Sequence, residues 1–368
     1  MIATAFDYKK ASSVAEAISM LQSAEDGKIL AGGHSLVPAM KLRLNSPDTL
    51  IDISKISGLR YIKDEGDRIT IGANATHGEI ANSDAIQSAI PMVAQAASMI
   101  GDPQVRNRGT IGGSLAHADP AADWPALMLA ADATFHLEGP NGERHVSASD
   151  FFTGFYETAL GENELITSIH LPKPTAGSVS TYQKFVQPAS RFAIVGCAIQ
   201  LTLDGSTIQD ARVAFSGLSE YAFRDGASEA ALKGCPLNDA TINSVMSNAG
   251  KADFVLSDHF ASEEYRSHLA RVYFKRAMQH LAEGNTKDEL TKIEGIGPKI
   301  AEILNNNGIH SFRQLAAASV SDVKAALAKA GNRYVIHDPG TWGRQAQMAA
   351  DGKWDELKKW QDELDGGK

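Results

Sequence analysis

The sequence predicts an α+β protein that ends in a small all-α unit. Two observations support this fold class. Strand-like and helix-like segments follow one another without the regular alternation of a doubly wound parallel sheet, and the segment after residue 284 has a helical pattern throughout. A length of 368 residues predicts two to three folding units, and 43% hydrophobic with 21% charged residues is ordinary for a protein with real cores.

The first 131 residues contain short strands and helices in irregular order. Apolar residues at helical spacing from Val14 to Leu21 predict a helix that is capped by Ser12 or Ser13. Apolar runs predict strands at 28–31, 50–53 and 68–72. Further helices are expected at 86–100, where Pro91 falls near the first turn, and at 120–131, which Pro120 opens.

The middle of the chain, from about 133 to 215, is predicted to be mainly strand, and the strand pattern is clearest at 164–172 and 193–203. Helical patterns return at 239–249 and 262–281. Residues 282–286 form the expected junction, because the sequence changes character after them. Beyond it we expect a helix, a tight hairpin at 295–299, a second helix, and helical segments at 312–330 and 354–364.

Composition limits the classes of function. A net charge of −9 argues against general nucleic-acid binding, which needs a basic surface. Cys197 and Cys235 stand in no CxxC pair, so by themselves they cannot hold an iron–sulfur cluster or a four-ligand zinc site, although a disulfide stays open. Redox chemistry would therefore need an organic cofactor or another chain's metals. With no secretory signal and no apolar run of about 18 residues, we expect a cytoplasmic protein without a membrane span.

Two glycine pairs have the surroundings of anion-binding loops, one in AGGHSL at 31–36 and one in TIGGSL at 110–115. Glycines let backbone N–H groups approach a phosphate closely, and serine adds a hydroxyl donor. Two such loops in one domain can grip a dinucleotide phosphate from two sides, although an isolated glycine pair is more often only a tight turn. Neither loop is a G-x-G-x-x-G motif followed by an acidic residue, so a Rossmann site is disfavoured.

The longer context of both pairs resembles one protein family. AGGHSLVPAMKLRL at 31–44 is similar to a signature of the FAD subunits in the carbon monoxide dehydrogenase and xanthine dehydrogenase family of molybdenum hydroxylases. DPQVRNRG at 102–109, which runs into TIGGSLAHADPAADWPA at 110–126, is similar to that family's second signature. The resemblance extends over about residues 1–283 and includes RFAIVG at 191–196.

The resemblance implies a FAD-binding domain of the vanillyl-alcohol-oxidase type over 1–175, in two subdomains split near 57, and a smaller α+β flavoprotein C-terminal domain over 176–284. It implies non-covalent FAD on this chain, [2Fe-2S] clusters on an iron–sulfur small subunit and molybdopterin on a large subunit, in a dimer of heterotrimers. Electrons would pass from molybdenum through the clusters to the flavin, and then to an external quinone, NAD or oxygen. The chain would be an oxidoreductase subunit with no catalytic residue, because a flavin that only relays electrons needs no substrate base.

The resemblance also assigns site residues position by position. The two loops would grip the pyrophosphate, Asp123 would bond toward the adenosine end, and Lys184 and Phe192 would lie near the flavin. His117 and Asp119 would shape a loop beside FAD rather than act as an acid–base pair, and the backbone of Leu165 or Ile166 would face the cofactor. The full set of expected FAD-binding residues is Ala31, Gly32, Gly33, His34, Ser35, Leu36, Ile100, Thr110, Ile111, Gly112, Gly113, Ser114, His117, Asp119, Asp123, Leu165, Ile166, Lys184 and Phe192.

His34 raises the question of a covalent bond. In some other flavoproteins of this broad fold, a histidine in an R-x-G-G-H context is bonded to FAD. Here Ala31 precedes the glycines, and the longer signature is similar to the non-covalent family. We therefore expect His34 to leave FAD unbonded.

The tail, residues 285–368, is expected to be a separate α domain. Its segment 288–315 resembles a helix-hairpin-helix motif, in which hairpin glycines and a lysine such as Lys299 contact a DNA phosphate in DNA-binding members. Over 285–368, however, nine lysines and three arginines balance seven aspartates and five glutamates, and a neutral module is a poor general DNA binder. We therefore expect nucleic-acid binding to be absent and the tail to dock within the complex.

Two rival functions stay open at this point. One is a stand-alone flavin oxidase of the same broad fold, and the other is a nucleic-acid-binding protein led by its tail. The form AGGHSL favours the carbon monoxide dehydrogenase-like branch. The branch does not name a substrate, because in this family selectivity resides at molybdenum on another chain.

Overall fold

The computed structural model describes residues 2–285 and 288–364. The chain forms two compact units that meet in the sequence between Gln279 and His280. The first unit combines three main sheets with helices, and the second is all-helical, so the predicted α+β class with an all-α tail is confirmed.

The first sheet is small and parallel, with the strand order β1-β3-β2. Ser13, not Ser12, caps the first helix by accepting a hydrogen bond from the Glu16 amide, while Ser12 itself bonds the Glu16 carboxylate. The small core beneath this sheet includes Ile18 and Ile51. Its elements are β1 (Asp7–Lys10), α1 (Val14–Ser23), β2 (Gly27–Leu30), α2 (Leu36–Lys41) and β3 (Thr49–Asp52).

The second sheet is antiparallel, with the order β4-β5-β10-β6-β7, and packs on the largest core of the protein. Ile71, Ile169, Phe135 and Val146 sit side by side across four of its strands and face this core. Its strands are β4 (Ile62–Asp64), β5 (Arg68–Gly72), β6 (Thr134–Gly139), β7 (Gly142–Ser147) and β10 (Leu165–Pro172); β8 (Phe152–Gly154) and β9 (Glu157–Thr158) form a separate pair.

Helices between β5 and β6 fill the space beside this sheet. The single helix predicted at 86–100 is wrong: Ile90 leaves the helical conformation, and Pro91 starts a new helix where its missing N–H costs nothing. The helix predicted from Pro120 starts only at Asp123. The helices between β5 and β6 are α3 (His77–Ala81), α4 (Asp84–Ala89), α5 (Pro91–Met99), α6 (Pro103–Arg106), α7 (Ile111–His117) and α8 (Asp123–Ala130), while η1 (Ser57–Leu59) precedes β4 and α9 (Ala148–Phe151) follows β7.

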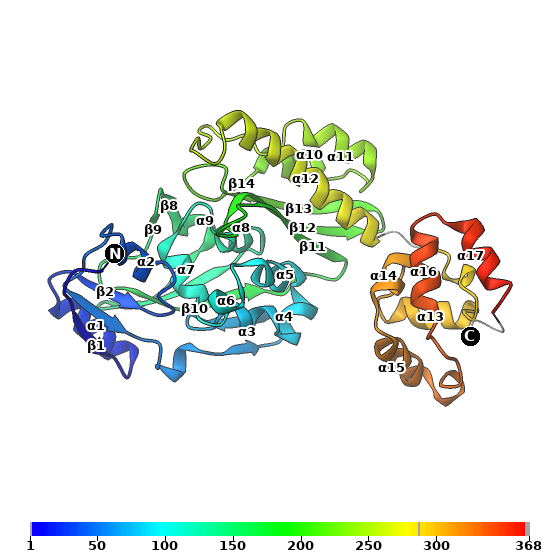
Figure 1. Ribbon diagram of the computed structural model, residues 1–368, viewed down its shortest axis with the longest axis horizontal. Coiled ribbons are helices and arrows are strands. Elements are labelled where there is room, and N and C mark those ends of the chain that lie inside the picture. The colour runs from blue at the N-terminus through cyan, green and yellow to red at the C-terminus, as the bar shows by residue number, and fades with distance from the viewer. Residues whose placement is uncertain (1, 286–287, 365–368) are drawn as a thin grey trace. The chain divides into compact units, whose positions relative to one another are not determined.

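The third sheet is an antiparallel meander of four strands, β11-β12-β13-β14. Helices α5 and α8 pack on one of its sides, and Figure 1 shows α10, α11 and α12 on the other. Helix α12 runs through most of the predicted junction at 282–286, of which Thr286 lies outside the described residues. The elements are β11 (Ser178–Val186), β12 (Ala193–Asp204), β13 (Thr207–Ser216), β14 (Phe223–Arg224), α10 (Gly226–Leu232), α11 (Asp239–Met246) and α12 (Glu263–Asn285).

The second unit has its own apolar core, built around Ile300, Leu315 and Trp342. The predicted hairpin at 295–299 is present, but only a short 3-10 turn precedes it where a helix was expected. The helix predicted at 312–330 is two helices, because Ser319 caps a new one. Its segments are η2 (Leu290–Lys292), α13 (Pro298–Asn306), α14 (Phe312–Ala317), α15 (Val320–Ala330), η3 (Asn332–Tyr334), α16 (Trp342–Ala350) and α17 (Trp354–Gln361).

None of the helices in the described part of the chain is long and apolar enough to span a membrane.

Candidate functional site

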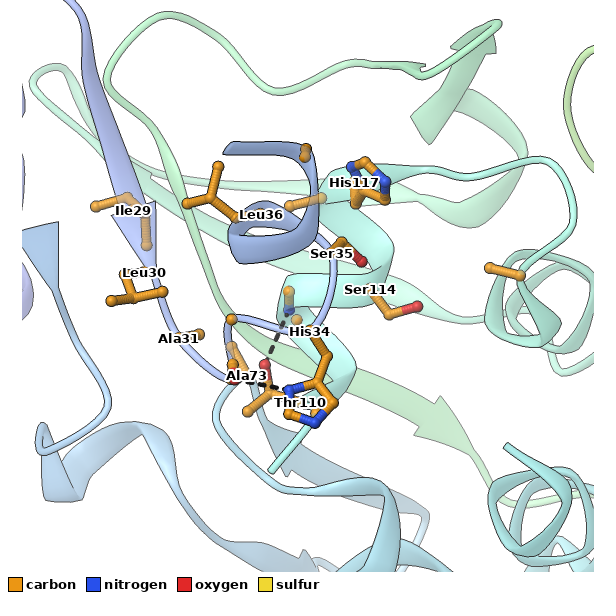
Figure 2. A pocket seen from close by; sticks show the side chains of 18 of the residues that line it. Ile29, Leu30, Ala31, His34, Ser35, Leu36, Ala73, Thr110, Ser114 and His117 are labelled. Atoms are coloured by element: carbon orange, nitrogen blue, oxygen red, sulfur yellow. Dashed lines mark hydrogen bonds between the residues drawn. The ribbon is translucent and has the colours of Figure 1, made fainter. Parts of the chain in front are cut away.

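A cavity of about 970 Å³ opens in the first unit, where the first and second sheets meet. This volume is near the upper end of the range for small-molecule sites, so it suits a large ligand. Both glycine loops lie on its wall (Figure 2). Sixteen of the nineteen residues expected from the sequence line it: Ala31, Gly32, Gly33, His34, Ser35, Leu36, Ile100, Thr110, Gly112, Gly113, Ser114, His117, Asp123, Leu165, Ile166 and Phe192.

The other three expected residues contact the wall from outside it. Ile111 is buried in the main core. Asp119 accepts a hydrogen bond from the hydroxyl of Tyr156, which is a lining residue. Lys184 is fully buried and paired with Asp123. Their expected contacts with a ligand stay predictions.

The first glycine loop presents a row of unpaired backbone donors. Gly33 has φ = +75°, a conformation that favours glycine. The N–H groups of residues 32–36 donate to no acceptor within the described residues. His34 is exposed and the other four residues are half-buried, so the row is open to a ligand and is suited to an anion. The hydroxyl of Ser35 lies beside it (Figure 2).

The two loops touch through glycine backbone. A β-carbon on Gly32 would lie 2.3 Å from the carbonyl oxygen of Arg108, and one on Gly112 would lie 2.6 Å from the β-carbon of Ala73. A side chain at Gly32 would force the first loop away from the second, and one at Gly112 would force the second loop away from Ala73, the residue after β5. The glycines are therefore required by close packing as well as by backbone conformation.

The second glycine loop differs from the first in its hydrogen bonding. Thr110 caps α7 and accepts from the Gly113 amide at 3.3 Å, while the amides of Ile111 and Gly112 donate to the carbonyl oxygens of Ala75 and Ala73. From the sequence, both loops are predicted to have the same chemistry. In the structure, this loop supplies shape and the Ser114 hydroxyl, and its own amides are already used.

His77 lines the cavity and was not singled out from the sequence. It is 5% exposed, and Nε1–H of Trp124 donates to its Nδ1 at 3.2 Å. Because the indole can only donate, the neutral imidazole carries its proton on Nε2. Burial, and then the nearby His34 and Arg106, lower the pKa of His77 from 6.5 to about 4. His77 is therefore a neutral polar group at physiological pH.

Asn74 is a second lining residue that the sequence did not indicate. Its Nδ2 donates to the carbonyl oxygen of Ile53 at 2.7 Å, whereas its Oδ1 is buried without a partner within the described residues. An orphaned buried acceptor costs stability unless a bound group donates to it. A ligand with hydroxyl or N–H donors would satisfy it.

His117, Asp119 and Tyr156 form a cluster at the cavity. The Tyr156 hydroxyl donates to Asp119 at 3.0 Å, and the Tyr156 ring meets the His117 ring edge-on. Burial lowers the pKa of His117, and burial with the Asp119 charge raises the pKa of Tyr156. Ala118 and Tyr156 both have a left-handed backbone conformation, and the expected loop-shaping role of His117 and Asp119 stays a prediction.

Asp123 is 4% exposed although it lines the cavity. Oδ2 accepts from Lys184 Nζ at 2.7 Å, and Oδ1 accepts from the Tyr182 hydroxyl. Burial raises the pKa of Asp123, while Lys184 and Tyr182 act in the opposite direction. Each carboxylate oxygen thus has a partner within the chain, and the expected bond toward adenosine stays a prediction.

The remaining wall is largely apolar and includes Ile100, Leu165, Ile166 and the ring of Phe192. A flat aromatic group has suitable surroundings there, whereas a phosphate belongs at the first loop. Within the described residues, no group of three or more His, Cys, Asp or Glu side chains is arranged to hold a metal ion. The donor set therefore fits an organic dinucleotide of the FAD type.

Three family profiles match consecutive parts of the chain. Residues 4–174 match the FAD binding domain in molybdopterin dehydrogenase, and residues 180–281 match the CO dehydrogenase flavoprotein C-terminal domain. Residues 290–350 match the RS2/RL21/YNQ2 HHH domain, so the helix-hairpin-helix resemblance of the tail is confirmed.

Similar proteins cover the chain up to the tail. The carbon monoxide dehydrogenase medium chain of Hydrogenophaga pseudoflava is 39% identical over 76% of this chain and 97% of its own length. The glyceraldehyde dehydrogenase medium chain of Sulfolobus acidocaldarius is 36% identical over 75% of this chain and 98% of its own. A solved carbon monoxide dehydrogenase from H. pseudoflava superimposes with a TM-score of 0.74 and 40% identity, covering 77% of this chain and 99% of that chain.

Proposed function

We propose an electron-relay function on one premise: the chain belongs to the family of FAD-binding medium subunits of the molybdenum hydroxylases. In this proposal the cavity holds FAD without a covalent bond. Electrons arrive from the iron–sulfur clusters of a partner subunit and leave to an external acceptor. Bound FAD supplies the redox chemistry that this chain's side chains lack.

The row of unpaired amides at residues 32–36 is the observation that supports the proposal most directly. These donors would hold the pyrophosphate, and the Ser35 and Ser114 hydroxyls would add further donors. The close approach of Gly32 to the Arg108 backbone holds this row of amides beside the second loop, which carries Ser114. The apolar wall near Phe192 would receive the flavin ring.

The buried ionisable residues of the cavity favour a relay over a stand-alone oxidase. His77 is bonded to Trp124, and Asp123 is paired with Lys184. A substrate oxidase would need a base free to take a proton from its substrate. Here these two groups are already committed to the structure.

The partners follow from the same reasoning. Two cysteines in 368 residues are too few for two iron–sulfur clusters, so we place the clusters on a small subunit and molybdopterin on a large subunit. A dimer of such three-chain units is the proposed assembly. The relatives carry the names of carbon monoxide and glyceraldehyde dehydrogenases at nearly equal identity, which supports placing substrate choice on the large subunit.

Purification of the native protein tests the assembly. We expect two further chains, iron and molybdenum to accompany this chain in fixed ratio. Flavin without partners, together with turnover of a substrate by this chain alone, would instead support the oxidase. Co-purified nucleic acid that survives high salt would support the tail-led function.

Electron transfer itself needs a direct measurement. The chemically reduced iron–sulfur subunit, added without the large subunit, should bleach the visible absorbance of FAD on this chain. The same chain stripped of FAD is the control. If the flavin stayed coloured while the clusters lost their electrons, the electrons would have gone elsewhere, which would contradict the expected result. If the flavin stayed coloured and the clusters stayed reduced, no electrons would have passed, which would rule out the relay.

A further inference from the structure

We propose that Lys184 is a positioning residue that acts on the cavity through the backbone of Arg191 and thereby fixes Phe192 on the wall. The inference rests on the proposed FAD-binding function. Lys184 itself lies outside the cavity wall. Its effect must therefore pass through the residues that it holds.

The Lys184 side chain has no solvent exposure, and its ammonium group donates two hydrogen bonds of 2.7 Å. One bond goes to the Asp123 carboxylate, which neutralises the buried charge. The other goes to the carbonyl oxygen of Arg191. The bond to Asp123 is enough to neutralise the buried charge. The bond to the Arg191 carbonyl has a separate consequence, because it ties β11 to the hairpin at residues 187–192.

This hairpin is closed by its own hydrogen bonds. The Gln187 amide donates to the Phe192 carbonyl at 2.9 Å, and the Arg191 amide donates to the Gln187 carbonyl at 2.8 Å. Ser190 donates from both its amide and its hydroxyl to the Gln187 side chain. The hairpin therefore moves as a unit, and a restraint on one carbonyl restrains the whole tip.

Arg191 has φ = +63°, which is unfavourable for a residue with a side chain. Without a partner for its carbonyl, this peptide would relax toward a commoner conformation. The Lys184 bond opposes that relaxation. Beyond Phe192, the Ala193 amide donates to the Ala121 carbonyl at 3.0 Å, so Phe192 lies between two fixed peptides.

Phe192 needs such a backbone restraint because it is 38% exposed. A half-exposed ring has few packing neighbours to define its position. Ser190 and Arg191 line the cavity beside it. The orientation of a ring that would face the flavin is thus set by Arg191, and the conformation of Arg191 is set by Lys184.

The chain offers a matched control in Tyr182. Its hydroxyl donates to Asp123, as Lys184 does, but makes no bond to the hairpin. Tyr182→Phe removes a buried donor from the carboxylate and leaves the Arg191 carbonyl held. Lys184→Met removes both connections.

The test measures FAD affinity, the visible circular dichroism of bound FAD and the thermal midpoint of the whole chain. Lys184→Met and Phe192→Ala should each weaken FAD binding about tenfold (about 1.4 kcal/mol) and reduce the flavin dichroism. The double variant should be no worse than either single variant, because both act through one ring. Tyr182→Phe should lower the thermal midpoint and keep the wild-type dichroism.

A second pair guards against misfolding of Lys184→Met. In the Lys184→Met background, Arg191→Gly and Arg191→Ala remove the same side chain, but only glycine adopts φ = +63° without strain. Arg191→Gly should therefore restore part of the lost dichroism of Lys184→Met, and Arg191→Ala should not. Additive effects of Lys184→Met and Phe192→Ala, or equal dichroism for the two Arg191 variants, would overturn the positioning role. If the wild-type chain itself failed to bind FAD, the failure would lie with the proposed function instead.

Discussion

Gly32 of the first glycine loop lies against the backbone of Arg108, at the entrance to the second loop. A β-carbon built on Gly32 would stand 2.3 Å from the Arg108 carbonyl oxygen, closer than real atoms approach. Arg108 is separated from Gly32 by 76 positions in the sequence, so this contact joins two distant signatures. The loops therefore form one structural unit.

Gly32→Ala should separate the loops and disturb the amide row at residues 32–36. Because a backbone atom blocks the new methyl group, relief requires movement of the loop itself. We expect FAD affinity to fall at least tenfold, or about 1.4 kcal/mol, as followed by flavin fluorescence during titration. Gly58→Ala is the matched control, because a β-carbon there meets nothing within 4 Å. Equal affinity of the two variants would contradict the prediction.

His77 should make the stability of the FAD-free protein depend on pH. Its pKa is about 4 in the fold and 6.5 in the unfolded chain, so the unfolded chain binds more protons between these values. The stabilisation is complete above pH 6.5 and is lost as pH falls toward 4. At pH 5 the loss is about 2 kcal/mol relative to pH 7. Urea unfolding at both pH values measures it.

His77→Gln is the comparison for this prediction, because glutamine can still accept from Trp124 without titrating. The variant should lose about 2 kcal/mol less than the wild type between pH 7 and pH 5. Parallel pH profiles for the two proteins would show that His77 is not the group responsible.

Local sequence predicted those parts of the fold that local interactions decide. Ser13 and the apolar spacing after it define α1, and the glycine pairs mark both loops. The helix predicted at 86–100 failed at Pro91, whose ring ends one helix and begins the next. Helix α16 was missed although Trp342, Ala346 and Ala349 carry its buried face at helical spacing.

The site residues that were missed depend on distant partners. Asn74 is placed by the Ile53 carbonyl, and His77 by Trp124, 47 residues away. Neither residue belongs to a sequence motif from which these long-range hydrogen bonds could be predicted. Lys184 was expected near the flavin, but its bond to Asp123, 61 residues away, was not. Sequence resemblance indicated the cavity, whereas its hydrogen bonding required the folded chain.

The FAD colour should be released by acid. His34 Nδ1 lies 3.1 Å from the carbonyl oxygen of Gly32, and a ring nitrogen that donates this bond stabilises the loop non-covalently. Precipitation with trichloroacetic acid should leave the yellow colour in the supernatant. His34→Gln keeps a side-chain donor and should retain FAD within about threefold of the wild-type affinity. Colour that stays in the pellet, and is lost from it in His34→Gln, would show a covalent bond.

The helix-hairpin-helix tail should be dispensable for FAD binding and required for assembly. Its core, centred on Trp342, is separate from the cores around the cavity, and every residue that lines the cavity lies between 28 and 192. A chain ending at Asn285 should therefore keep its FAD affinity and the thermal midpoint of the first unit.

Because the tail is electrically neutral, loss of nucleic-acid binding is not the expected defect. We expect the truncated chain to bind the small and large subunits more weakly, measured by size-exclusion chromatography at decreasing concentration. Gly308→Ala, at φ = +83° in the loop after α13, strains the tail without removing it and should weaken assembly to a smaller degree. Normal assembly of the truncated chain, with normal flavin bleaching by the reduced partner, would exclude a docking role for the tail.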